Sequence, residues 1–280
     1  MSNLTIGLLL ALLSTCATAL AHAFLKAGRD KLAVQAWIRL VGLAVAIPFA
    51  IWMGPPPVYL IWWIVGAAAI HAVYQFVVSW SYSVSDFSVA FPLARGATPI
   101  FTCILGVALL GDRLGTLMIA GVAIVSVGIL LLALRGGVTR IGLAAAALAA
   151  MLTTAYTIVD AHAVRIAPEP LLFIAWFFVA DGFSMPAALF ARSRGNGLAA
   201  LAGEARTGAA AGVVTLFAFV PALFAFALAP VGAVSALREC SILIGLALGG
   251  TMLKEKLDGN RIAGAALIVL GGLAIVAQSF

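Results

Sequence analysis

The sequence predicts an all-α membrane protein with ten transmembrane helices, arranged as two inverted five-helix repeats around a central cavity. An apolar composition, apolar runs of helical length and an internal repeat predict this fold. Of the 280 residues, 64% are hydrophobic and 9% are charged, whereas about 25% of the residues in an ordinary soluble domain are charged. The runs approach or exceed the roughly 20 residues that a helix needs to cross a bilayer, while barrel strands would be about half as long and would alternate in polarity.

Charged residues, prolines and glycines divide the chain into ten apolar spans with short connections. No polar segment is large enough to form a separate soluble domain. The first span imitates a signal peptide, but because no basic residue precedes it we expect it to be retained. The expected spans are 4–25, 34–53, 57–83, 87–110, 116–134, 141–163, 170–190, 208–228, 232–252 and 261–279.

The internal repeat emerges when residues 89–128 are aligned with 232–271 at a constant shift of 143 positions. We therefore divide the chain into a first repeat, 1–135, and a second repeat, 136–280. Because each repeat holds an odd number of spans, the second must enter the membrane from the opposite side. The six identical pairs are Arg95 and Arg238, Gly106 and Gly249, Leu114 and Leu257, Ile119 and Ile262, Gly121 and Gly264, and Gly128 and Gly271.

The basic residues of the connections lie mostly on one side of the predicted membrane. Eleven lie on the side opposite the N-terminus, and only Arg113 and Arg165 lie on the N-terminal side. Cytoplasmic connections carry such an excess, so both termini are expected to face outward. The net charge of +6 is spread thinly over these connections, without the basic stripe of a nucleic-acid-binding protein.

The sequence contains none of the common enzyme or cofactor motifs considered below. Cys16, Cys103 and Cys240 lie far apart in apolar runs, so we expect neither a disulfide nor a metal site. No phosphate-cradling loop, paired-histidine zinc motif or nucleophile elbow is found, and we expect no cofactor and no enzyme activity. The glycines of the repeat suit close packing of helices within the chain and need not imply dimerisation. The sequence is therefore compatible with a monomer.

A polar face on the third span is the strongest indication of a cavity. His71, Tyr74, Gln75, Ser79 and Tyr82 share one helical face. Facing lipid, their polar groups would lose hydrogen bonds, so we expect them to line a cavity and bind a small molecule. The alternative is hydrogen bonding between helices or anchoring at the membrane interface, above all for Tyr82. Their counterparts at the shift of 143 are all apolar: Val214, Phe217, Ala218, Ala222 and Ala225.

Other spans carry weaker candidates for the same binding site. Tyr156 shares a face with threonines on the sixth span, and Trp176 on the seventh could stack on an apolar or aromatic ligand. Arg95 and Arg238 lie about 12 Å inside their spans, where a guanidinium could bind a carboxylate or could serve the structure alone. We include Arg95 in the expected site, whereas a structural reading is slightly favoured for Arg238.

Three acidic residues within spans are candidates for proton coupling. They are Asp181, which lies near the expected midplane, Asp160 and Glu239. A buried carboxylate can take up a proton in a neutral medium, but a buried arginine beside it would oppose this. Transport by facilitated diffusion, without coupling, therefore stays open.

Two short motifs resemble a known family. Asp112-Arg113-Leu114, followed by Ile119-Ala120-Gly121 and Gly128, is matched by Glu255-Lys256-Leu257, followed by Ile262-Ala263-Gly264 and Gly271. These segments resemble the twice-repeated EamA unit of the drug/metabolite transporter superfamily, over nearly the whole chain. In length and in the aromatic third span, the chain looks closest to the YddG-type aromatic amino-acid exporters.

The resemblance implies a ten-helix secondary transporter of a bacterial-type plasma membrane that exports small metabolites through a central cavity by alternating access. Its partners would be a small-molecule substrate and the lipid bilayer. We expect amphipathic substrates, above all aromatic or large apolar amino acids. The alternatives are the export of other metabolites or drugs, a membrane-embedded enzyme, and a scaffold without transport.

The predicted orientation can be tested by labelling a cysteine from intact cells. Ser193 lies in a connection that the charge distribution places in the cytoplasm. In a Ser193→Cys variant, a membrane-impermeant thiol reagent should react only after the membrane is opened. Ready labelling from outside would overturn the orientation, though not the inverted repeat.

Overall fold

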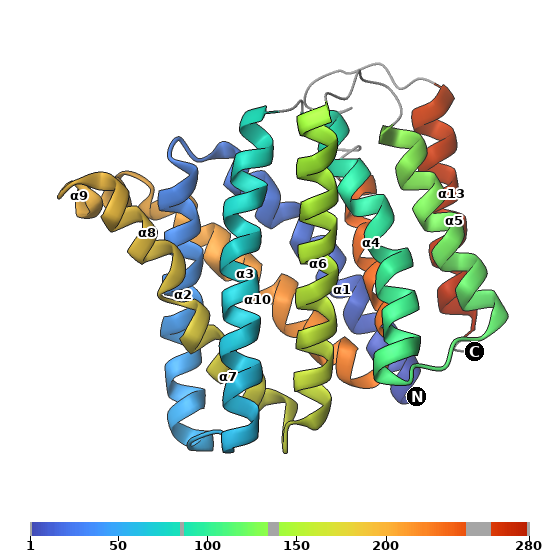
Figure 1. Ribbon diagram of the computed structural model, residues 1–280, viewed down its shortest axis with the longest axis horizontal. Coiled ribbons are helices and arrows are strands. Elements are labelled where there is room, and N and C mark those ends of the chain that lie inside the picture. Colours follow the sequence, from blue (N-terminus) through green and yellow to red (C-terminus); the bar gives the residue numbers. More distant parts are fainter. Residues whose placement is uncertain (1, 85–86, 134–139, 245–258, 279–280) are drawn as a thin grey trace.

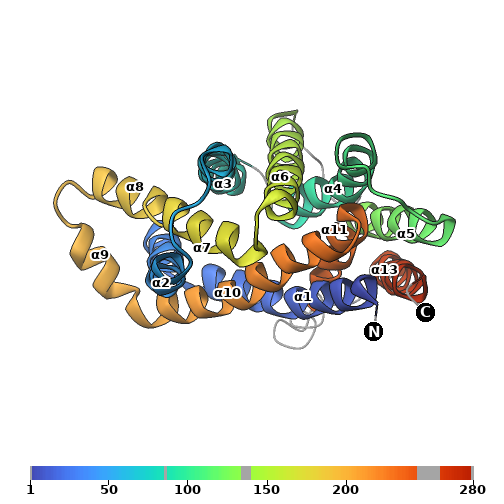
Figure 2. The ribbon, with the colours of Figure 1, turned by 90° about the horizontal axis from the view of Figure 1, so that it is seen from below.

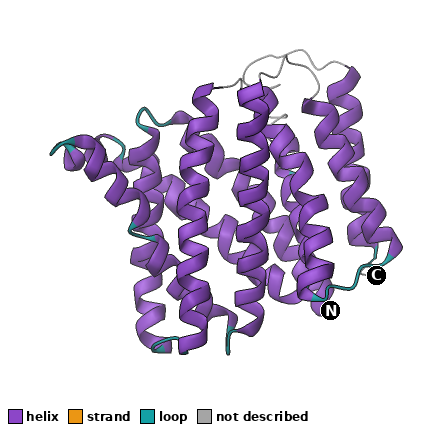
Figure 3. Ribbon diagram, in the orientation of Figure 1, coloured by secondary structure: helices purple, strands orange, loops and turns teal. Residues whose placement is uncertain are grey.

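A computed structural model describes residues 2–84, 87–133, 140–244 and 259–278 of the chain, with side chains except those of 22, 26, 78–84, 87–96, 133, 142 and 261. All regular secondary structure in this part of the chain is helical (Figure 3). The helices are α1 (Asn3–Ala27), α2 (Lys31–Met53), α3 (Val58–Val84), α4 (Phe87–Leu110), α5 (Thr116–Ala133), α6 (Arg140–Ile166), α7 (Pro170–Asp181), α8 (Ser184–Ser193), α9 (Gly197–Gly203), α10 (Ala205–Leu228), α11 (Val231–Glu239) and α13 (Gly259–Ala277).

Six stretches of helix in the described residues are long and apolar enough to cross a membrane, which confirms the expectation of an all-α membrane protein. Three further apolar helices, 97–110, 116–132 and 262–277, are shorter. The six are Asn3–Leu25, Lys31–Met53, Val58–Val77, Leu143–Ile166, Pro170–Ser193 and Ala205–Leu228.

The long helices run between two ends of the molecule (Figure 1). Both termini lie at one end, together with the α2–α3, α4–α5 and α6–α7 connections. Seen along the helices, α3, α6 and α4 form one row, α10 and α1 lie opposite, and α7 and α11 lie between them (Figure 2). Helices distant in sequence therefore pack together: α1 lies along α10, and α3 along α6.

Polar side chains fix the ends of the first two helices. The Ser2 hydroxyl accepts a hydrogen bond from the Thr5 N–H at 3.1 Å and so caps α1. The Asp30 carboxylate accepts hydrogen bonds from the Leu32 and Ala33 N–H groups and caps α2. Both caps satisfy donors that have no partner within the helix.

The expected seventh span, 170–190, is divided into two helices. The chain turns after Asp181, where a Cβ atom on Gly182 would lie 2.8 Å from the Cβ of Leu43 on α2. The Ser184 hydroxyl donates a hydrogen bond to the Asp181 carbonyl at 2.8 Å. The break therefore lets the chain pack closely on α2. A search for apolar runs alone does not detect such a break. Most of the second part of the expected span 232–252 lies outside the described residues.

The repeated glycines lie in a seam between α5 and α13. A Cβ atom on Gly121 would lie 2.7 Å from the Gly271 carbonyl oxygen, and one on Gly128 would lie 2.8 Å from that of Gly264. Both distances are shorter than a side chain tolerates, so glycine is needed at these positions. The two backbones therefore touch directly, as small residues allow between membrane helices.

A methyl group in this seam should destabilise the protein. Gly128→Ala forces α5 away from α13 and should cost about 1–3 kcal/mol of folding free energy, as overpacking does in other cores. Gly66→Ala is the matched control, because it lies within α3 and a Cβ atom there has open space. Thermal unfolding of the purified variants compares the two. Equal melting temperatures would contradict the close approach of α5 and α13.

Candidate functional site

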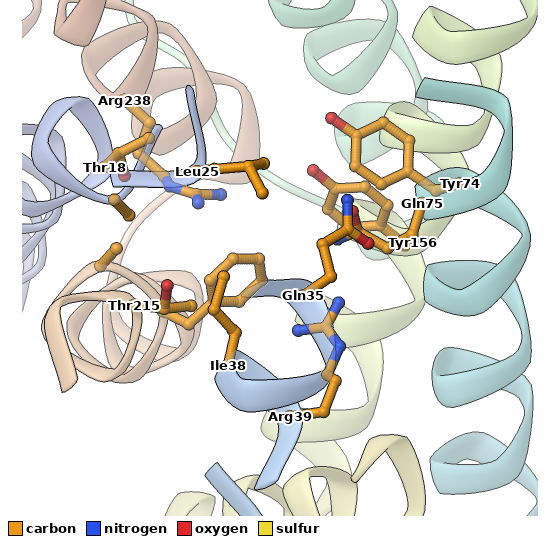
Figure 4. A pocket seen from close by; sticks show the side chains of 13 residues that line it. Thr18, Leu25, Gln35, Ile38, Arg39, Tyr74, Gln75, Tyr156, Thr215 and Arg238 are labelled. Carbon is orange, nitrogen blue, oxygen red and sulfur yellow. The ribbon is translucent and has the colours of Figure 1, made fainter. Parts of the chain in front are cut away.

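A cavity lies between the helices (Figure 4), and its lining residues on α1 and α2 belong to the halves of these helices nearer the α1–α2 connection. It holds about 740 Å³ of space free of protein atoms, including its open mouth. Six helices, three from each predicted repeat, contribute to its wall. The lining residues are Thr18, Ala21 and Leu25 of α1, Gln35, Ile38 and Arg39 of α2, Tyr74 and Gln75 of α3, Tyr156 of α6, Thr215, Ala218 and Phe219 of α10, and Arg238 of α11.

One wall of the cavity is formed by α3, which carries the predicted polar face, and by α6. Tyr74 and Gln75 line the cavity from α3, and Tyr156 lines it from α6. The rings of Tyr74 and Tyr156 meet edge to face with centroids 5.2 Å apart, a favourable arrangement for aromatic pairs. The other predicted members, Ser79, Tyr82 and Arg95, have side chains outside the described residues.

His71 lies behind this wall and not in the lining. Its ring is 1% exposed, and its Nε2 lies 2.9 Å from Oδ2 of Asp160. The ring centroid lies 4.1 Å from that of Tyr156 and 4.9 Å from that of Phe177. Asp160 thus fixes the imidazole, and the imidazole supports Tyr156 from the rear.

A buried ion pair forms the base of the cavity. Nε of Arg39 lies 2.9 Å from Oδ2 of Asp181, and these side chains are only 6% and 1% exposed. Two charges in this environment are tolerated only as a pair. Arg39 reaches the lining, whereas Asp181 is not among the described lining residues.

Arg238 lines the cavity from α11, on the side opposite Tyr74 and Tyr156 (Figure 4). Its Nε lies 3.3 Å from the Ser14 hydroxyl oxygen, and its guanidinium carbon lies 5.3 Å from the centre of the Phe219 ring. The neighbouring Glu239 is 5% exposed and lies outside the lining. The structural reading favoured for Arg238 from the sequence therefore missed its access to the cavity.

Trp176 lies elsewhere than the sequence analysis expected. Its indole N–H donates a hydrogen bond to the Gly54 carbonyl at 2.9 Å, which joins α7 to the α2–α3 connection. It is not among the described side chains that line the cavity. Of the predicted site residues whose side chains are described, Tyr74, Gln75 and Tyr156 line the cavity, while His71 and Trp176 do not.

Several lining residues were missed in the sequence. Gln35 and Arg39 stand four positions apart, so they share one face of α2. This pattern in an apolar span is the signal that could have found them, as it found the polar face of α3. Gln35 is 6% exposed, and its Oε1 has no hydrogen-bond partner among the described residues.

A polar cluster joins several helices at the end of the molecule where the termini lie. Arg165 donates from Nη1 to Oδ1 of Asp112 at 2.7 Å, and the Val231 N–H donates to the other carboxylate oxygen at 2.6 Å. Arg165 also donates to the carbonyls of Phe226 at 2.8 Å and Ala229 at 3.0 Å. The α4–α5 connection is thereby tied to α6, α10 and the start of α11.

Comparison with known proteins finds a similar fold but no protein of known function. No family model matches the chain, and no curated protein matches it. A solved structure named only "Crystal structure of protein" is similar, with a TM-score of 0.72 and 20% sequence identity over 99% of both chains. At this identity the similarity concerns the fold alone.

Removing the Asp112 carboxylate should destabilise the end of the molecule where the termini lie. Asp112→Ala leaves the Arg165 guanidinium and the Val231 N–H without their acceptor, and should lower the free energy of unfolding by about 2–4 kcal/mol. The adjacent Arg113→Ala is the control, since Arg113 is exposed and a surface change there should stay within about 0.5 kcal/mol. Thermal or denaturant unfolding in detergent measures both. A similar loss in both variants would show that the cluster contributes little.

Proposed function

We propose that this protein is a secondary transporter of a bacterial-type plasma membrane, which exports small amphipathic metabolites by alternating access. The substrates we propose are amino acids with aromatic or large apolar side chains. The observation that carries the proposal is the open cavity between helices of both halves, with aromatic faces and polar groups in one lining. Such concave sites, mostly apolar with a few placed polar groups, are typical for small molecules.

The packing of the helices supports two inverted repeats, 1–135 and 136–280. At the shift of 143, α1 corresponds to α6 and α3 to α10, and α1 packs on α10 just as α6 packs on α3. The glycine seam follows the same rule, because Gly121 meets Gly271 while Gly128 meets Gly264. Such an exchange of equivalent contacts is typical of a two-fold relation. Inverted repeats around a central site are a frequent design of secondary transporters.

Access to the cavity differs between the two ends of the molecule. The lining residues of α1, α2 and α3 belong to the halves of these helices near the α1–α2 connection. At the other end, the cluster of Asp112 and Arg165 binds the start of α11. With the orientation predicted from charge, the cavity would face the cytoplasm, where an exporter loads its substrate.

The lining favours substrates with an aromatic or large apolar part. Tyr74, Tyr156 and Phe219 offer ring faces and edges, and Ile38 and Leu25 add aliphatic surface. Aromatic pairs contribute about 0.5–1.5 kcal/mol beyond the burial of their surface. The same lining would also suit other metabolites or drugs with an apolar body, which are the alternative cargo. A coupled proton at Asp160, Asp181 or Glu239 stays a prediction.

Flux measurements in liposomes test the function. Purified protein in liposomes should move labelled phenylalanine faster than protein-free liposomes do. Tyr74→Ala should weaken the apparent affinity for phenylalanine by about three- to tenfold, since 1.4 kcal/mol corresponds to a tenfold change. Threonine flux should fall less, because this smaller side chain does not fill the space beside the ring.

Phe76→Ala is the matched control, because Phe76 lies two positions along the same helix and is 52% exposed. It should leave both fluxes unchanged. Equal losses for phenylalanine and threonine in Tyr74→Ala would indicate that Tyr74 serves the fold. The absence of flux for a broad panel of labelled metabolites would exclude transport and favour the rival reading, a membrane-embedded enzyme.

A further inference from the structure

The charges of the cavity wall do not balance. Arg39 and Arg238 are the two charged residues among the described lining side chains. Asp181 neutralises Arg39 at 2.9 Å. No ion pair joins Arg238 to a carboxylate within the described part of the chain. One positive charge is thus left facing the cavity.

The contacts of Arg238 leave its terminal nitrogens available. The Ser14 hydroxyl donates its own proton to the Ala218 carbonyl and accepts from Nε of Arg238. Phe219 covers one part of the guanidinium with its ring. The described residues provide no hydrogen bond to Nη1 or Nη2, and Figure 4 shows the guanidinium pointing into the cavity. Those two nitrogens are the donors that bind a carboxylate in a bidentate manner.

Gln35 adds an acceptor to the same space. Its amide oxygen is buried and has no hydrogen-bond partner among the residues described, and its side chain reaches the lining between Arg39 and Tyr156. A buried acceptor without a donor costs free energy, which a ligand with an N–H group would recover. An ammonium group supplies such donors.

We propose that Arg238 binds the carboxylate of the transported molecule and that the Gln35 amide oxygen accepts a hydrogen bond from its ammonium group. The ligand class is a zwitterionic α-amino acid, whose side chain then lies toward Tyr74 and Tyr156. Arg39 does not take this role, because Asp181 already neutralises its charge. The inference rests on the proposed function, which it deepens by assigning the two ends of the substrate.

Three related ligands separate the two contacts. L-phenylalanine carries both charged groups, 3-phenylpropionate only the carboxylate, and 2-phenylethylamine only the ammonium. Their affinities for the full-length protein in detergent are measured by calorimetry. The wild-type protein should bind phenylalanine and 3-phenylpropionate more tightly than 2-phenylethylamine, because Arg238 attracts an anion and repels a cation.

The variants should then change these affinities selectively. Arg238→Gln should weaken phenylalanine and 3-phenylpropionate by at least about tenfold, without weakening 2-phenylethylamine. Arg238→Lys should retain part of the affinity, since it keeps the charge but loses the bidentate geometry. Gln35→Leu should weaken phenylalanine but not 3-phenylpropionate. Arg206→Gln, an exposed site at the start of α10, removes the same charge and should change nothing.

Melting temperatures without ligand show whether each variant is folded. If Arg238→Gln does not fold, the affinities of Arg238→Lys test the inference instead. The inference is overturned if Arg238→Gln or Arg238→Lys binds 3-phenylpropionate like the wild type, or if no carboxylate binds the wild-type protein. Flux in liposomes tests the function separately. If the Arg238→Gln variant still transports phenylalanine with unchanged affinity, the inference is rejected but the proposed transport function stands. If binding depends on Arg238 but the protein moves none of the ligands, the carboxylate site stands and the transport function is rejected.

Discussion

Polar and charged groups buried in an apolar protein are costly unless they find partners, and the partners of the buried acids organise this structure. The Arg39–Asp181 ion pair joins α2 to α7, and the Arg165–Asp112 ion pair joins α6 to the α4–α5 connection. A hydrogen bond between His71 and Asp160 joins α3 to α6. Each pair connects helices that are distant in sequence. Because an unpaired charge in this environment is costly, a helix that slid or rotated out of register would lose more than its packing. The pairs thus restrict the helices to the arrangement that leaves a cavity between them.

The wall of the cavity is held from behind. Asp160 fixes His71, and His71 stacks on the ring of Tyr156, which in turn meets Tyr74 edge to face. These contacts reduce the freedom of the two tyrosine rings before any ligand arrives. A wall that is already ordered loses less conformational entropy on binding. His71 and Asp160 therefore hold this wall from behind, and the surface toward the cavity belongs to Tyr74, Gln75 and Tyr156.

The sequence predicted the helical fold because a bilayer leaves few other ways to satisfy the backbone, and long apolar runs report this directly. It also placed Tyr74, Gln75 and Tyr156, since polar side chains on one face of an apolar helix need a polar surrounding. It did not predict which acid meets Arg39, because that depends on how α2 packs against α7. The sequence did not predict the division of the expected span 170–190 for the same reason. The turn at Gly182 is explained by its contact with Leu43, not by a local signal.

The glycine seam between α5 and α13 has a mechanical consequence. The two backbones touch directly, and side chains of each helix, such as Ile275 and Leu132, pack against the glycines of the other, so α5 and α13 form one closely packed pair. The seam lies at one edge of the molecule, and α2, α8 and α9 lie at the opposite edge (Figure 1). Any rotation that keeps Gly121 against Gly271 moves each helix in proportion to its distance from this edge. A rigid-body turn about this edge would therefore displace α2, α8 and α9 more than any helix near the seam.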